Sequence, residues 1–113
     1  MTDTELPNPW LRGVLDLCLL SLLVDGEAYG YELAGRLAEL GIGSVPGGSL
    51  YPALLRLEKS GHLKADWRAG DGGPGRKYYR LTPSGRRALS RDAQSWRAFS
   101  AVMDRVVDRV PVR

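Results

Sequence analysis

Apolar residues in the first half of the chain fall into three segments with the spacing of helices. The first segment, 10–24, is apolar on nearly every side, which predicts a helix at the centre of the core. The second, 29–40, is followed by Gly41, which we expect to close the helix. Its apolar stripe is formed by Tyr29, Leu33, Leu37 and Leu40, and we expect Tyr31 to face the core as well.

The third segment, 47–60, has a narrower apolar face and a distinctive front end. Leu50, Leu54 and Leu57 recur at helical spacing and should face the core, and Gly61 supplies the left-handed residue that ends a helix. Because a glycine-bearing turn joins this helix to the second one, the pair predicts a helix-turn-helix. The residues that fall largely outside the apolar face are Ser49, Tyr51, Arg56 and Lys59.

Two short segments after this helix have the residues of strands. Segments 63–68 and 77–81 are rich in residues that suit a pleated surface, including Trp67, Tyr78 and Tyr79. The glycine-rich segment 69–75 between them should form a mobile hairpin tip. A helix-turn-helix followed by such a hairpin predicts a winged helix-turn-helix.

The rest of the chain predicts one long helix that needs a partner. Thr82 is a cap and Pro83 suits the first helical position. An isolated helix must bury its apolar stripe, and so little chain remains that a second copy of the protein is the expected partner. The stripe, with spacings of three and four residues, consists of Leu89, Ala93, Trp96, Phe99, Met103, Val106 and Val110.

The predicted fold class is therefore mainly α with a small β-hairpin: a winged helix-turn-helix domain plus one C-terminal dimerisation helix. We expect a flexible N-terminal segment at 1–9, a DNA-binding domain at 10–82 with its wing at about 63–81, and the dimerisation helix at 83–113. The length of 113 residues fits this single domain with an appendage.

Charge is segregated along the chain and favours a nucleic-acid partner. The net charge is only +3, but residues 56–91 contain ten basic and three acidic side chains, and therefore carry +7. A run of charge is often a solvated face, but this one coincides with a helix end and a hairpin. The acidic start of the chain has no signal-peptide pattern, and the first apolar segment is too short to span a membrane, so we expect a cytoplasmic protein.

The expected DNA-binding residues lie on the third segment, the second segment and the wing. Amides at a helix N-terminus attract phosphate, hydroxyl groups can donate to phosphates or base edges, and glycines let a duplex come close. Two alternatives stay open: Tyr51 and Pro52 simply pack the turn, or the hairpin is merely solvated. Tyr29 likewise either binds a phosphate or fills the core. The candidates are Tyr29, Gly48, Ser49, Tyr51, Pro52, Arg56, Lys59, Arg76 and Lys77.

Nothing in the sequence assembles a catalytic or metal site. The only histidine, His62, has no clustered partner, and the only cysteine, Cys18, lies in an apolar run that predicts a buried small side chain. No nucleophile with a base and no carboxylate pair is present, so we expect neither an enzyme nor a cofactor.

Trp96 on the C-terminal stripe suggests a ligand site. Two indoles facing each other across a two-fold axis would form a flat slot for a planar aromatic effector, with Ala93 and Phe99 beside it. Asp16 either supplies polar orientation to that slot or faces water. The alternative, a large residue that only fills the dimer interface, stays open.

In combination, several blocks resemble the PadR family of bacterial transcriptional regulators. They are segments 11–15, 29–33, 48–54 and 75–85, together with Arg56, Leu57, Glu58 and Gly61. The resemblance implies a homodimeric repressor that binds a two-fold symmetric operator in double-stranded DNA and is released by a small molecule. The single C-terminal helix with Trp96 is similar to the small, drug-sensing members, whose paired tryptophans sandwich flat ligands. The competing hypothesis is a winged-helix module that binds another protein, or DNA without effector control.

Overall fold

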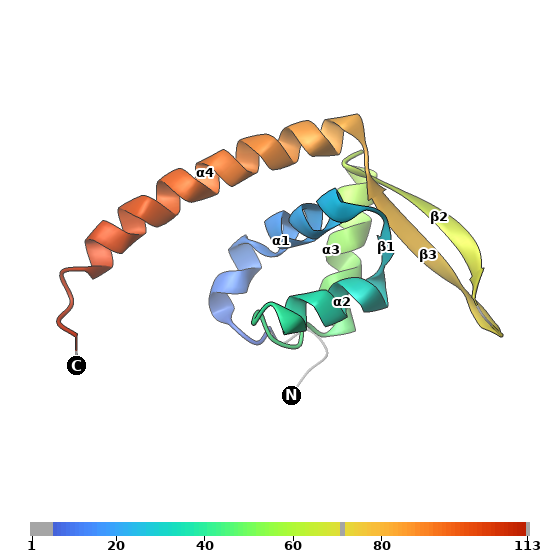
Figure 1. Ribbon diagram of the computed structural model, residues 1–113, viewed down its shortest axis with the longest axis horizontal. Coiled ribbons are helices and arrows are strands. Elements are labelled where there is room, and N and C mark those ends of the chain that lie inside the picture. Colours follow the sequence, from blue (N-terminus) through green and yellow to red (C-terminus); the bar gives the residue numbers. More distant parts are fainter. Residues whose placement is uncertain (1–5, 71, 113) are drawn as a thin grey trace.

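The computed structural model describes residues 6–70 and 72–112, and its elements follow the predicted order (Figure 1). The described residues form six helical segments and three strands. In chain order they are η1 (Pro9–Gly13), α1 (Leu15–Leu22), η2 (Leu23–Asp25), β1 (Ala28–Tyr29), α2 (Gly30–Glu39), α3 (Gly47–Lys59), β2 (Leu63–Gly70), β3 (Gly73–Leu81) and α4 (Pro83–Val107).

The predicted first helix, 10–24, is divided into three pieces, so the expectation of one continuous helix was wrong. The Asn8 side chain accepts a hydrogen bond from the Trp10 amide at 2.8 Å and starts the 3₁₀ segment η1. Val14 then leaves helical geometry, with φ −125° and ψ 3°. Glycine and a β-branched residue are both poor helix formers, which favours a break at Gly13–Val14. Leu11 before the break and Leu15 after it are both buried.

Helix α2 begins one residue later than predicted and buries a narrower face. Leu33 and Leu37 are completely buried, as expected. Tyr31 is 77% exposed and Leu40 is 69% exposed, so both were wrongly assigned to the core. Tyr31 lies two positions before Leu33, about 200° around the helix, and Leu40 follows the last helical residue, where it projects past the core.

The wing is a hairpin of two long antiparallel strands with β1 added along its other edge. The strand order is β1-β3-β2, and β2 pairs with β3 from Leu63↔Leu81 to Gly70↔Gly73. Most of the segment predicted as a mobile tip therefore lies within the two strands. Pairing of Ala28 with Tyr79 ties the start of α2 to the sheet. A strand of two residues has no alternating pattern, so β1 was not predicted from the sequence.

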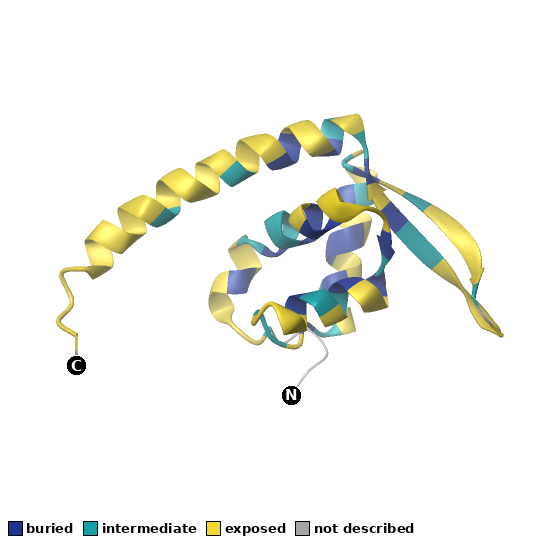
Figure 2. Ribbon diagram, viewed as in Figure 1, coloured by how far each residue is buried: buried dark blue, intermediate teal, exposed yellow. Residues whose placement is uncertain are grey.

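Leucine side chains from α1, α2 and α3 meet the inner face of the sheet and form the core, shown in dark blue in Figure 2. Residues 1–5 of the predicted flexible segment lie outside the described residues, and Leu6 is half-buried against the core. The largest fully buried side chains are Leu19, Leu20, Leu23, Leu33, Leu37, Leu50 and Leu54.

Helix α4 is anchored to the domain through its first turns. Thr82 accepts a hydrogen bond from the Gly85 amide at 2.9 Å and donates to the Gly61 carbonyl at 2.6 Å. Leu89 is buried in the core of its own chain, so the uncovered stripe begins beyond it. Farther along, α4 leaves the domain and its surface is mostly exposed (Figures 1 and 2). Val110 lies past the helix end, so the helical stripe is shorter than predicted.

Candidate nucleic-acid interface and ligand groove

The N-terminus of α3 is an open helix end. Pro46 occupies the cap position in extended geometry, and no side chain caps the helix. The amides of Ser49 and Leu50 donate to the Pro46 carbonyl at 2.9 and 3.0 Å. The first amides of such a helix, those of Gly47 and Gly48, have no partner within the helix and are suited to an anion. The starts of α2 and α4 differ, because the side chains of Glu32 and Thr82 bind backbone amides there.

Tyr51 packs the junction between α2 and α3 and also reaches solvent. A Cβ atom on Gly30 would lie 2.4 Å from the ring, and one on Gly47 would lie 3.5 Å from it. Gly30 therefore provides the space for this ring. Half of Tyr51 (50%) remains exposed, so the packing role and the hydroxyl's access to a ligand are compatible. Pro52 is exposed beside it, whereas Gly48 and Ser49 are half-buried.

The wing is held against α3 by an ion pair. Lys77 Nζ lies 2.9 Å from Glu58 Oε1, and this hydrogen bond raises the pKa of Lys77. Lys77 also lies 5.5 Å from the centre of the Tyr79 ring. Tyr79 is buried, and burial raises the pKa of its hydroxyl. The sequence predicts that Lys77 contacts DNA; in the free protein this side chain orients the wing.

The opposite face of the wing combines two arginines with two aromatic rings. Arg76 stacks 4.6 Å from the centre of the Tyr29 ring, and Arg68 lies 4.7 Å from that of Tyr78. The two rings meet edge to face at 5.3 Å. Arg68 Nη2 also binds Glu27 Oε2 at 2.7 Å, and this hydrogen bond raises the pKa of the guanidinium. Tyr29 and Arg76 thus occupy one surface, although 47 positions apart in sequence.

Arg56 and Lys59, at the far end of α3, differ from each other. Arg56 Nη2 binds Asp16 Oδ1 at 2.7 Å and so joins α3 to α1. Lys59 is exposed one turn away. Arg56 is therefore engaged within the protein. The same ion pair occupies the Asp16 carboxylate, which was predicted either to orient a ligand or to face water.

An open groove of about 960 Å³ lies between α1 and the outer part of α4. Trp96, Phe99 and Asp16, which the sequence places at a ligand slot, line this groove, whereas the half-buried Ala93 does not. Trp96 also lines a smaller groove of about 380 Å³ on the other side, next to Cys18 and Leu40. Cys18 is only half-buried, and this partial burial raises its thiol pKa.

The outer part of α4 presents a band of apolar side chains next to these grooves. Leu89, at the start of the stripe, is buried in its own chain, whereas nothing in the single chain covers the band. Its members are between 37% and 57% exposed: Trp96, Phe99, Val102, Met103, Val106 and Val107.

Two exposed tryptophans belong to these surfaces and were not selected from the sequence. Trp10 is 80% exposed and lines the larger groove. Trp67 is 72% exposed on the wing, on the strand face that buries Leu63. The i, i+2 spacing of Leu63, Ala65 and Trp67 could have revealed Trp67. This spacing places all three on one face of β2, and Trp67 lies where that face extends beyond the core.

Some of the remaining features are unrelated to these sites. His62 is half-buried and its Nδ1 lies 3.3 Å from Ser60 Oγ. Within residues 6–70 and 72–112, no group of three or more histidine, cysteine or acidic side chains could hold a metal ion. None of the helices described is long and apolar enough to cross a membrane.

An open-ended second helix of a helix-turn-helix, flanked by a basic hairpin, defines the class of winged-helix DNA-binding regulators. The model of the transcriptional regulator PadR-like family matches residues 19–91. The chain belongs to this family, whose members are transcriptional regulators rather than enzymes, as the sequence blocks indicated.

Individual relatives agree with this assignment. A transcriptional regulator from Mycobacterium tuberculosis is 39% identical over 84 residues, which cover 74% of this chain and 77% of the relative. A PadR-like regulator from Bacillus cereus is 37% identical, with a TM-score of 0.78 and coverage of 88% of this chain and 97% of that one. A PadR family regulator from Eggerthella lenta is 36% identical, with a TM-score of 0.77 and coverage of 87% of this chain and 85% of that one.

Proposed function

We propose that this regulator is a homodimeric repressor that inserts the N-terminus of α3 into the major groove of each half of a two-fold symmetric operator. The observation that carries the proposal is the uncapped end of α3, with Ser49 and Tyr51 beside its first amides. Such an end can bind a phosphate with its amides while its hydroxyl groups reach base edges. A protein that acts on transcription in this way works in the cytoplasm, where bacterial DNA is located.

The uncovered half of α4 supports the dimer. Six apolar side chains on this segment are exposed in the single chain, and a second copy would bury them along the same stripe. Two copies of α3 would then be held at a fixed separation, as reading two half-sites requires. The tip of the wing and Tyr29 would contact the backbone on either side of each half-site.

The groove beside Trp96 is proposed to bind the effector, a planar aromatic cation. Aromatic rings from Trp10, Trp96 and Phe99 supply flat apolar surface. Three carboxylates, those of Asp16, Asp92 and Asp104, also line this groove, and its described lining contains no lysine or arginine. Because Asp16 is paired with Arg56, and Asp92 lies 3.8 Å from Arg91 Nε, Asp104 is the carboxylate best able to attract a cation. Ligand binding would change the position of α4, and with it the separation of the two α3 helices.

Operator binding is tested by footprinting the upstream region of the protein's own gene, followed by titration of the protected duplex. Tyr51→Phe keeps the ring against Gly30 but removes the hydroxyl, and Ser49→Ala removes the second one. We expect this double variant to lose roughly tenfold or more in preference for operator over random duplex, since a good polar base contact contributes about 1–3 kcal/mol. Ser90→Ala, on an exposed position of α4, is the control.

Wild-type binding that is equally tight to operator and random duplex would contradict the operator proposal. An unchanged preference in the double variant would assign base reading to other residues.

The effector proposal has a separate test. Calorimetric titration with a flat cationic dye should show binding that Trp96→Ala abolishes, while Trp67→Phe on the distant wing leaves it unchanged. If both variants bind the dye as the wild type does, Trp96 only packs the dimer, and regulation is independent of such an effector.

A further inference from the structure

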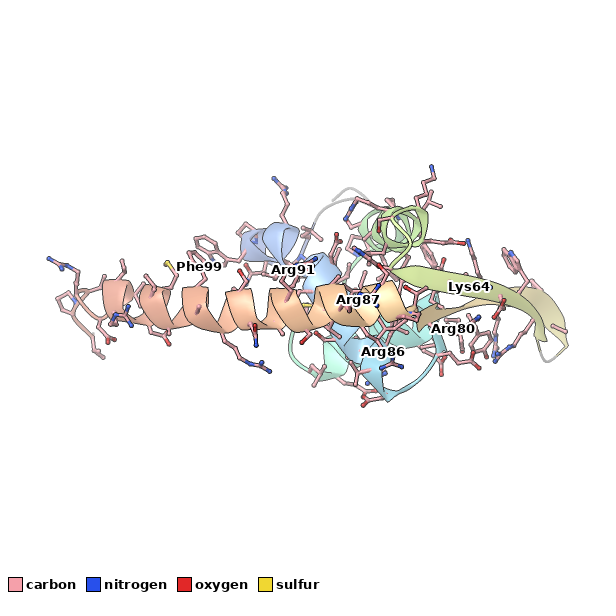
Figure 3. All side chains as sticks on the ribbon, turned by 90° about the horizontal axis from the view of Figure 1, so that it is seen from above. Lys64, Arg80, Arg86, Arg87, Arg91 and Phe99 are labelled. Carbon is pink, nitrogen blue, oxygen red and sulfur yellow. The ribbon has the colours of Figure 1, made fainter. Side chains whose placement is uncertain are left out.

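A second basic surface lies at the base of the wing and over the first turns of α4. It is formed by Lys64 on β2, Arg80 on β3, and Arg86, Arg87 and Arg91 on α4. We call it the α4 basic surface. Figure 3 looks down on α4 and shows these five side chains between the middle of the molecule and the base of the wing, with Phe99 farther along the helix. All five residues are exposed.

Acidic side chains offset this charge only in part. Arg80 pairs with Asp66, and Arg91 Nε lies 3.8 Å from Asp92 Oδ1, at the limit of an ion pair. In residues 6–70 and 72–112, no side-chain hydrogen bond or ion pair involves Lys64, Arg86 or Arg87. Lys64 and Arg80 are also direct cross-strand partners, so like charges face each other across the sheet. The surface therefore has an excess of positive charge.

The position of two of the arginines strengthens this excess. Arg86 and Arg87 follow closely after the start of α4 at Pro83, and the first turn of that helix contains no acidic residue. A helix N-terminus carries a partial positive charge, which repels cations and attracts anions. The helix dipole of α4 and the arginines on its first turns therefore both favour binding of an anion.

The α4 basic surface is remote from the end of α3 that reads the operator. Thr82, at the start of α4, is bonded to Gly61 and His62, which follow the C-terminal end of α3. At 1.5 Å per residue, the 13 residues of α3 put about 20 Å between that end and the N-terminus. Lys64 and Arg80 are likewise about 20 Å from the hairpin tip, at 3.3 Å per strand residue. A straight operator duplex held by α3 and the tip does not reach them.

We infer that the α4 basic surface binds the phosphate backbone of duplex DNA outside the operator. Four of its five cations are arginines, whose planar guanidinium groups match phosphate in bidentate geometry. Their spread over one helix and two strands suits a long polyanion better than a single small anion. The duplex would be either the flanks of the operator fragment, curving around the protein, or a separate DNA segment. This inference rests on the proposed operator binding in one respect: it takes the duplex held by α3 to be the operator.

The test uses an Arg86→Glu, Arg87→Glu variant. Both positions are exposed, and glutamate near the start of a helix is stabilising, so this variant should fold at least as well as the wild type. Arg97→Glu, Arg109→Glu makes the same change of net charge at exposed positions farther along the chain and is the matched control. Light scattering verifies that all three proteins have the same oligomeric state.

Three titrations distinguish the sources of DNA: a short operator duplex, the operator with long flanks, and capture of a labelled random duplex by protein bound to immobilised short operator. Affinity for the short operator should change by less than about twofold, since 20 Å exceeds the screening length of about 8 Å at physiological salt. Binding of flanked operator, or capture of the second duplex, should fall at least about tenfold in the Arg86, Arg87 variant only. The assay that shows the loss identifies flanking or separate DNA.

Equal losses in the variant and the control, or no loss in either, would overturn the inference. It would also be overturned if polyglutamate displaced the second duplex as effectively as random DNA did, because the surface would then fit an acidic protein. Failure of the wild type to prefer operator over random duplex is a different result. It contradicts the proposed operator binding, and comparison of the two variants on long random duplex still decides the role of the α4 basic surface.

Discussion

Helices α3 and α4 are both amphipathic, but they bury their apolar faces in different ways. In α3, Leu50, Leu54 and Leu57 are buried within their own chain. In α4, Leu89 is the last apolar side chain buried in this way, and Phe99 and Val106, farther along, are 57% and 51% exposed. A single chain is therefore enough to bury the apolar face of the domain that contains α3. The apolar face of the outer part of α4 stays exposed in a single chain. The boundary lies just beyond Leu89.

The largest effect is expected where the two regions join. A Cβ atom on Gly85 would lie 2.0 Å from the His62 carbonyl oxygen, so Gly85→Ala must push α4 off the turn that follows α3. We expect a loss of about 3 kcal/mol or more in the free energy of unfolding, measured by urea titration, because backbone rather than a flexible side chain blocks the added atom.

The matched control is Gly35→Ala, in the middle of α2, where an added Cβ meets no atom within 4 Å. Alanine there should be neutral or stabilise by up to about 1 kcal/mol. Similar losses in both variants would show that α4 is not seated through Gly85.

The next effect should appear only in self-association. Val106→Asp places a charge in the apolar band of α4, and we expect it to weaken the dimer by about 2–4 kcal/mol, or roughly 30- to 1,000-fold in the dissociation constant. Sedimentation over a range of concentrations measures this. Val112→Asp makes the same change at a position that is 97% exposed and should leave the dimer intact. A wild type that remains monomeric at high micromolar concentration would refute the assignment of this band to a second copy.

The sequence was most informative where local pattern and burial coincide. The leucine spacing predicts α3, Thr82 and Pro83 predict the start of α4, and strand-forming residues on either side of a glycine-rich segment predict the wing. The misassignments of Tyr31 and Leu40 arose because a stripe gives the apolar face of a helix but not how far the core extends along it. The break at Val14 follows two poor helix formers, whose local signal the continuous apolar run outweighed. The two-residue strand β1 depends on tertiary contacts that no short window contains.

The candidate site shows the same division. The basic block and the helix end containing Ser49 and Tyr51 are visible in sequence, because each is contiguous. The ion pairs Arg56–Asp16 and Lys77–Glu58 join residues 40 and 19 positions apart, so the sequence could only assign those cations to DNA. Trp10 was not selected because its partner in the groove, Trp96, lies at the other end of the chain.

A smaller effect is expected from the ion pair that holds the wing to α3. Because Glu58 raises the pKa of Lys77, the pair contributes stability at pH values below the unfolded lysine pKa of about 10.4. That contribution is lost as the pH rises through the higher pKa of the folded state. The difference in unfolding free energy between wild type and Lys77→Met should be about 0.5–1 kcal/mol at pH 7–9, because both side chains are partly exposed, and should shrink as the pH rises past the lysine pKa of the folded state. A difference that is constant across this range would assign the effect of Lys77 to packing instead of charge.

The smallest expected effect is on the alkylation rate of Cys18. This rate shows whether a second copy covers the smaller groove, and its measurement requires no substitution at Cys18. Its thiol lines the groove beside Trp96, and burial raises its pKa, so little thiolate is present at pH 7.5. We expect alkylation to be several-fold slower in the folded protein than in the urea-unfolded chain. If a second copy covers this groove, the rate should fall further as protein concentration rises. The dimer-weakening Val106→Asp should remove that concentration dependence and retain the basal slowing, since the first depends on the partner and the second on the chain's own fold. Alkylation as fast as in the unfolded chain would show that the groove opens freely on the α1 side and that the raised pKa does not limit the thiol.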